Sequence, residues 1–231
     1  MPTFRDYLTD WGMLGKHKQR ALERAVGDLP AALDLAAGRL RSPSGASFYT
    51  QLLATHAHAT WLWGWANEAP LPAHVLRVAG TLRSWGERQN LVEMTSPTVF
   101  DEVAEPEALA LVSTALTPAT GYYRAPAARG DVYVLLYGKI AEEPTCAEDI
   151  LETIHAFAST FAVDERRAVT SFFHGLGLEV EEDETCVRGV LPSGQVAEVA
   201  FEHRRIVAMR ERDRMPSRVV PRLARASRAA G

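Results

Sequence analysis

The side chains with the most chemical potential in this chain are a few histidines and two cysteines. His56 and His58 are two residues apart, so on a strand both imidazoles would point the same way, a geometry that suits transition-metal ligands. The segment lies where a turn is expected, and no Glu or Cys close by completes a ligand set. We therefore predict polar turn histidines and no metal site.

The two cysteines, Cys146 and Cys186, could be nucleophiles with His155 or His174 as the base. Cys146 precedes a predicted helix whose first turn carries two carboxylates, which disfavour a thiolate. The sequence has no phosphate-binding glycine loop, dinucleotide fingerprint or Gly-x-Ser-x-Gly elbow. We predict no catalytic residue and no cofactor. The alternative is an enzyme of unrecognised type that uses His56, His58 or His174.

Charge is spread unevenly along the chain, whose net charge is −4. The segment 93–107 holds five acidic residues and no basic one, and a second acidic cluster runs from Glu179 to Glu184. The last eighteen residues contain no acid and five arginines, four of which would share a face of a helix: Arg214, Arg218, Arg222 and Arg225. Prolines argue against a continuous helix there. Nucleic-acid binding through this tail is a second alternative.

The run Thr60–Asn67 places three tryptophans at alternating positions, the period of a β-strand. All three indoles, those of Trp61, Trp63 and Trp65, would then point to one face. Trp85 on the following helix is the expected facing partner. This row either fills the space between sheet and helices or anchors a client or a second subunit.

The remaining pattern predicts a chain that alternates helices with short strands. Helices are expected at 4–26, 73–88, 107–116, 147–161 and 164–174, and strands at 32–35, 39–41, 48–54, 60–66, 121–126, 131–137, 178–180, 186–191, 195–201 and 206–210. This predicts an α+β domain at 1–141, a smaller α+β unit at 145–213 and a basic tail at 214–231. The element order of 17–65 echoes that of 165–210, which suggests two related units.

Composition favours a soluble protein of the cytoplasm. Hydrophobic residues make up 47% and charged residues 23%, as in globular domains with a buried core. The longest apolar stretches, such as 132–137, are too short to span a membrane. Two cysteines suit a reducing compartment.

Three segments resemble an uncharacterised bacterial family over residues 30–137: Trp61–Asn67, Trp85-Gly86-Glu87 and Gly121–Pro126. The element order is also similar to the YbjN-like and type III secretion chaperone-like fold, a small twisted antiparallel sheet packed on helices. That resemblance implies a homodimer that binds another protein and catalyses no reaction.

We therefore expect a chaperone-like protein-binding module whose acidic surface steers a basic client, such as a nucleic-acid-binding protein. The expected platform is formed by the tryptophans Trp61, Trp63, Trp65 and Trp85. The expected steering residues are Glu102, Glu105, Glu181, Glu182, Asp183 and Glu184.

Overall fold

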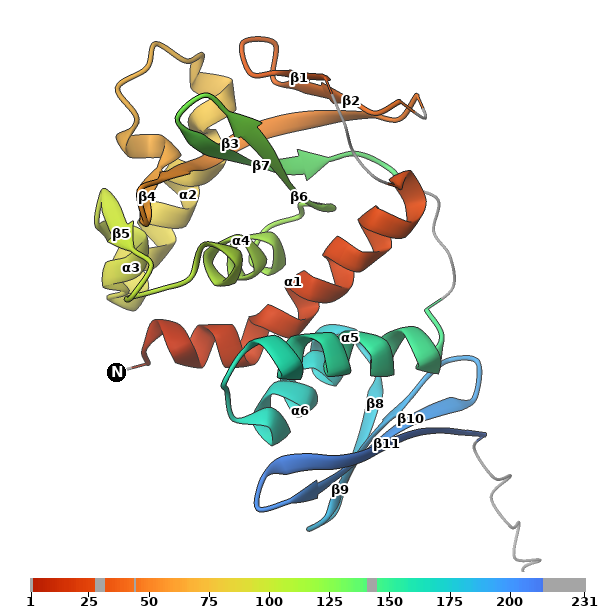
Figure 1. Ribbon diagram of the computed structural model, residues 1–231. Helices are drawn as coiled ribbons and strands as arrows, with labels where there is room; N and C mark the ends of the chain where they lie inside the picture. The colour runs from red at the N-terminus through yellow and green to blue at the C-terminus, as the bar shows by residue number, and fades with distance from the viewer. Residues whose placement is uncertain (1, 28–31, 44, 141–144, 214–231) are drawn as a thin grey trace, which may run out of the picture.

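The computed structural model describes residues 2–27, 32–43, 45–140 and 145–213, and these form a mixed α+β fold with two antiparallel sheets (Figure 1). The helices are α1 (Phe4–Val26), α2 (Ala73–Gln89), α3 (Val92–Thr95), α4 (Pro106–Ala115), α5 (Ala147–Thr160) and α6 (Glu165–Gly175). The strands are β1 (Ala32–Asp34), β2 (Arg39–Arg41), β3 (Ser47–Ala57), β4 (Thr60–Trp63), β5 (Thr98–Phe100), β6 (Gly121–Ala127), β7 (Gly130–Tyr137), β8 (Glu179–Glu182), β9 (Cys186–Val190), β10 (Gln195–Glu202) and β11 (Arg205–Asp213).

Helix α1 runs between the two halves of the protein and contacts both (Figure 1). It begins with a capping box, in which the Thr3 hydroxyl accepts from the Asp6 amide and the Asp6 carboxylate accepts from the Thr3 amide. It ends at Gly27, whose φ of 70° lies in the left-handed region that glycine tolerates. The predicted helix 4–26 is confirmed.

Two glycines set how closely α1 approaches its neighbours. A Cβ on Gly15 would lie 2.1 Å from the carbonyl oxygen of Leu111 on α4. A Cβ on Gly12 would lie 2.5 Å from the ring of Phe157 on α5. Since the first contact is with backbone, a larger residue at position 15 would force the two helices apart. The glycines therefore hold α1 tightly between α4 and α5.

The first sheet is a curled half-barrel built around the long strand β3 (Figure 1). One edge of β3 pairs with β2 and β4, and the other pairs with β7, which in turn pairs with β6. Three successive residues of β3, Leu52, Leu53 and Ala54, are buried where the register with β7 shifts. Both faces of β3 are thus covered, with α2 packing on one of them.

The second sheet is a four-stranded meander in the order β11-β10-β9-β8. Its inner face carries Val187, Val199 and Phe201, which belong to the same buried cluster as Phe157 of α5 and Trp61 of the first sheet. The units predicted at 1–141 and 145–213 therefore share one continuous core through α1. In each half a helix is followed by four strands that pair in chain order, α1 by β1–β4 and α6 by β8–β11. This is the similarity of element order that the sequence indicates.

The predicted strand 60–66 is wrong in its second half. Strand β4 ends at Trp63, and Gly64–Ala66 form a 3-10 turn. A Cβ on Gly64 would lie 2.8 Å from the Leu52 carbonyl oxygen. Glycine at this position therefore allows the turn to lie close to the backbone of β3. Trp65 consequently leaves the row formed by Trp61 and Trp63.

Two short elements that the sequence did not predict follow α2. Helix α3 and strand β5 form within the proline-bounded segment 91–105, where Leu91, Met94 and Val99 enter the core. Strand β5 pairs with β4 and ends the sheet on that side. These elements hold Glu93 and Asp101 in place.

We predict that Gly15→Ala destabilises the protein, because overpacking against backbone costs about 1–3 kcal/mol and outweighs the higher helix propensity of alanine. Gly80→Ala in α2 is the matched control, since a Cβ there meets nothing within 4 Å. It should raise stability by about 0.5–1 kcal/mol. Thermal unfolding of both variants measures this, and an unchanged midpoint for Gly15→Ala would contradict the close approach.

His17 of α1 is a buried histidine that the structure keeps neutral. Its Nδ1 lies 3.3 Å from the Thr153 hydroxyl, and its ring packs edge-on against Phe172. Burial lowers the pKa of His17 to about 4, and the positive charge of Arg24 adds to this effect. The negative charge of Asp149 raises the pKa, but by less.

Acid should therefore weaken the fold through His17. The unfolded chain binds a proton near pH 6.5 and the folded chain only near pH 4, so stability falls as the pH drops through that window, by up to about 3 kcal/mol. His17→Gln should show a smaller loss between pH 6.5 and 4 than the parent, measured by urea unfolding. His155→Gln, on the exposed side of α5, is the control for removal of an imidazole, and an equal change of slope in both variants would contradict the role of His17.

Candidate functional site: an acidic groove beside the start of α1

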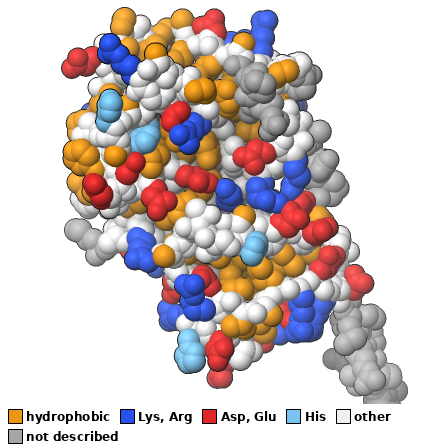
Figure 2. All heavy atoms as spheres, in the orientation of Figure 1, with side chains coloured by type: hydrophobic (Ala, Val, Ile, Leu, Met, Phe, Trp, Pro, Cys, Tyr) orange, Lys and Arg blue, Asp and Glu red, His pale blue; other side chains and the backbone are white. Residues whose placement is uncertain are grey.

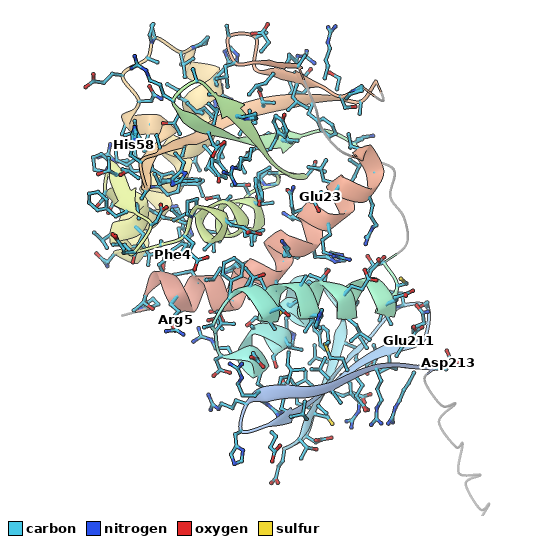
Figure 3. All side chains as sticks on the ribbon, in the orientation of Figure 1. Phe4, Arg5, Glu23, His58, Glu211 and Asp213 are labelled. Carbon is cyan, nitrogen blue, oxygen red and sulfur yellow. The ribbon has the colours of Figure 1, made fainter. Side chains whose placement is uncertain are left out.

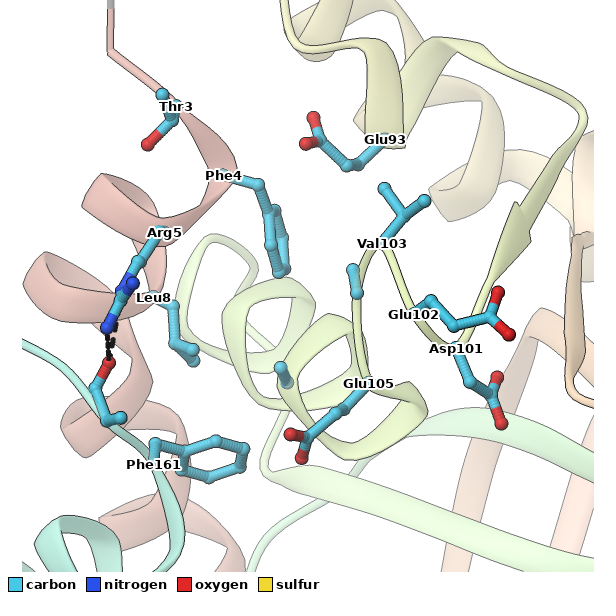
Figure 4. Close-up of a pocket in the computed structure, with 13 residues that line it drawn as sticks. Thr3, Phe4, Arg5, Leu8, Glu93, Asp101, Glu102, Val103, Glu105 and Phe161 are labelled. Atoms are coloured by element: carbon cyan, nitrogen blue, oxygen red, sulfur yellow. Dashed lines mark hydrogen bonds between the residues drawn. The ribbon is translucent and has the colours of Figure 1, made fainter.

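A groove of about 390 Å³ lies between the first turns of α1 and the loop 101–105 that joins β5 to α4 (Figure 4). The Phe4 side chain extends from α1 toward that loop (Figure 4). Most of the apolar lining is almost fully buried, at Phe4, Leu8, Ala104, Ala108 and Phe161, whereas Val103 and Ala162 are exposed at its rim. The groove therefore offers a hydrophobic floor of limited depth.

Carboxylates dominate the polar lining of this groove. Four acidic residues line it, Glu93, Asp101, Glu102 and Glu105, against one basic residue, Arg5. Glu93 and Glu105 extend toward the gap, whereas Asp101 and Glu102 point to the other side of the loop (Figure 4). Arg5 donates to the Ala162 carbonyl oxygen over 3.0 Å.

Three of these carboxylates have no counter-ion. Asp101 lies 3.0 Å from the imidazole of His56, but Glu93, Glu102 and Glu105 form no ion pair with any described residue. Unpaired charges of one sign create a negative potential around the groove. The surface is thus suited to a cationic ligand.

Exposed hydrophobic side chains flank the same loop. Among the described residues, five large hydrophobic side chains are more than half exposed, and three of them are Val92, Phe100 and Val103, at 61%, 56% and 58%. Acidic and hydrophobic side chains are intermixed on this side of the molecule (Figure 2). We call the lining residues and these three side chains together the acidic groove.

The other predicted acidic cluster is held by arginines. The Asp183 carboxylate accepts from the amides of Thr185 and Cys186, each at 2.9 Å, and forms an ion pair with Arg188. These interactions, led by the Thr185 amide, hold the pKa of Asp183 well below its usual range. Arg166 pairs with Glu182 and donates to the carbonyl oxygens of Asp183 and Glu184. This cluster stabilises a turn.

A buried carboxylate on the second sheet was missed by the sequence analysis. Glu198 is 1% exposed and lies among three arginines, Arg188 at 2.7 Å, Arg210, and Arg212 at 3.3 Å. The signal was a single acid within the apolar strand segment 196–201. Each of these three arginines forms an ion pair with Glu198, and Arg188 also pairs with Asp183, so the described strands of the second sheet present no unpaired arginine at these positions.

The predicted tryptophan platform is corrected by the structure. Trp61 and Trp63 are fully buried and meet edge to face with centroids 5.6 Å apart, because β4 lies inside the half-barrel. Trp65 lies under the Arg83 guanidinium, and Trp85 packs against Tyr7. The four indoles form no continuous surface, so a client could not contact Trp61 or Trp63 in the folded protein.

The structure does not bring the candidate histidines together. His56 lies within β3 and contacts Asp101, so the prediction of two turn histidines is wrong for this residue, whereas His58 is exposed in the following turn with a φ of 51°. His174 is exposed near the end of α6, in the other half of the fold. In the described ranges, no three His, Cys, Asp or Glu side chains are grouped as ligands for a metal ion. The enzyme alternative requires two of these histidines to meet carboxylates in one cleft, and the described residues do not form such a site.

The tail arginines Arg214, Arg218, Arg222 and Arg225 lie outside the described residues. Within the described part of the chain, no helix is both long and apolar enough to cross a membrane.

More than half of the chain matches a protein-family model. Residues 5–139 match a family described as "Family of unknown function (DUF6882)". This range includes α1 from Arg5 onward, the loop 101–105 and the whole first sheet, and it leaves out Thr3, Phe4, Phe161 and Ala162 of the groove lining. No curated protein and no solved structure matches the chain.

Because Asp183 organises the β8–β9 turn, we predict that Asp183→Ala lowers the thermal midpoint measurably. The amides of Thr185 and Cys186 lose their acceptor, and Arg188 loses an ion-pair partner. Glu184→Ala is the matched control, since no described residue pairs with its side chain. Equal midpoints for the two variants would show that the cluster has no structural role.

Proposed function

The chain belongs to the family of unknown function DUF6882, and we propose that it is a non-catalytic protein-binding module whose acidic groove holds a basic, partly hydrophobic segment of another protein. The observation that carries the proposal is the combination of an apolar floor and three exposed hydrophobic side chains with unpaired carboxylates, of which Glu93 and Glu105 extend toward the gap and Glu102 lies on the far side of the loop. Cationic and apolar groups on one ligand would satisfy both parts of this surface.

Electrostatics and hydrophobic contact would contribute differently to such binding. Unpaired surface carboxylates accelerate and orient the approach of a basic partner, an effect that salt screens over about 10 Å. Burial of Val92, Phe100 and Val103 would supply affinity, because their exposed area is removed from water on contact. Together they favour an amphipathic segment over a purely polycationic one.

The finer features of the proposal follow the YbjN-like and type III secretion chaperone-like resemblance. We propose that the module acts as a chaperone-like partner and forms a homodimer in the cytoplasm. Its basic client would be a nucleic-acid-binding protein, whose own cationic surface complements the groove. Edge strand β5, next to the groove, offers a place where an extended client segment could add to the sheet.

A non-catalytic role is supported by the placement of the histidines. His56 faces one carboxylate, and His58 and His174 are exposed on separate elements. A general base needs a substrate-binding cavity within hydrogen-bond reach, and none of these three imidazoles lines the acidic groove. The acidic groove therefore supports the binding function better than the enzyme alternative.

We predict that the double variant Glu102→Lys plus Glu105→Lys binds basic clients at least about tenfold more weakly at low ionic strength. The probe is a fluorescently labelled peptide of alternating arginine and leucine, titrated by anisotropy. The same variants serve as baits in affinity purification from the native organism. Both side chains are exposed, so the fold should be unaffected.

The matched control is Glu68→Lys plus Glu202→Lys, which makes the same charge change at exposed sites outside the groove. It should bind the peptide and co-purifying proteins as the parent does. If both double variants lose binding equally, net charge alone drives the interaction. If neither loses binding, the groove is not the client site.

A further inference from the structure

The C-terminal segment of this chain has the chemistry that the acidic groove selects. Residues 214–231 contain five arginines and no acid. Hydrophobic residues are interspersed among them, at Met215, Val219, Val220 and Leu223. This is a basic and partly hydrophobic segment within the protein itself.

We propose that the acidic groove binds the arginine-rich C-terminal segment, residues 214–231, of a second copy of the chain. The inference rests on the proposed function, since it uses the same surface. Arginines of the segment face the unpaired Glu93 and Glu105, and its hydrophobic residues cover Phe100 and Val103. The unpaired Glu102, on the far side of the same loop, adds to the negative potential. Arginine suits this surface because its planar guanidinium forms bidentate pairs with carboxylates.

The position of the chain end favours a second copy over the same chain. Asp213, where the described chain ends, lies on the opposite side of the molecule from Phe4 and Arg5 (Figure 3). Eighteen extended residues span at most about 60 Å. A chain of this length folds to a sphere with a half-circumference on the order of 70 Å. The segment would have to be almost fully extended around the molecule to bring its arginines to the groove of its own chain, a loss of chain entropy that a second copy avoids.

A second copy removes this constraint. Two chains that exchange their segments satisfy two grooves with two tails, a closed pair of the kind that symmetric dimers form. The segment would then occupy the client site until a client of higher affinity displaces it. Exchange of the tails would therefore regulate access to the groove.

Reciprocal charge reversal in the full-length chain tests the proposal. The groove variant carries Glu102→Lys and Glu105→Lys, and the tail variant carries Arg218→Glu and Arg222→Glu. Sedimentation velocity at low salt measures self-association of the parent, each variant alone, and an equimolar mixture of the two. The control with Glu68→Lys and Glu202→Lys undergoes the same measurement.

We expect the parent and the control to form dimers, and each variant alone to associate at least about tenfold more weakly. In the mixture both interfaces have complementary charges, since the parental tail meets the parental groove and the reversed tail meets the reversed groove. The mixture should therefore regain the dimer. Regain in a mixture requires contact between chains, which distinguishes the second copy from the same chain.

Three results would overturn the proposal: a monomeric parent at high concentration, variants that associate like the parent, or a mixture that stays monomeric. The arginine–leucine peptide separates this failure from that of the proposed function. If the peptide still binds the groove in a Glu102- and Glu105-dependent manner, only the tail proposal fails. If the peptide binding is also independent of these residues, the client site itself is wrong.

Discussion

The close approach of α1 to α4 and α5 is the constraint on which the rest of the structure depends. Gly15 allows the backbone of α1 to meet the Leu111 carbonyl oxygen, and Gly12 admits the ring of Phe157. Because a Cβ at either position would clash, the two glycines let α1 lie close to both helices and so between the two halves of the fold (Figure 1). The same placement brings Phe4 opposite the loop 101–105 and thereby creates the acidic groove.

Charge compensation separates the two acidic clusters that look alike along the chain. Asp183 and Glu182 lie beside arginines that the fold brings to them, and Asp183 also accepts two amides. Glu102 and Glu105 lie on a loop where no described residue pairs with them. A carboxylate that already has partners contributes little to the field outside the protein, whereas an unpaired one attracts cations. Availability for a client thus depends on the tertiary partners of each carboxylate.

Unlike the unpaired carboxylates, Trp61 and Trp63 are made inaccessible to a client by the tertiary structure. Trp61 and Trp63 contribute large buried areas and an edge-to-face contact to the core, so their effect on a client is indirect. Of the five large hydrophobic side chains that are more than half exposed among the described residues, three lie in the segment 92–103, whose short helix and strand the sequence pattern did not predict. The apolar surface beside the groove therefore comes from these two small elements and the loop that follows them.

The sequence by itself determined most helices, most strands and the α+β class, because apolar periodicity, glycine stops and the Asp164 cap are local signals. It also marked Glu102 and Glu105 as members of an acidic segment. Only the tertiary structure decided that Trp65 leaves the strand, that Glu198 gathers three arginines and that His174 stands apart from His56. Burial, ion pairing and helix approach depend on residues distant in sequence, so no local pattern encodes them.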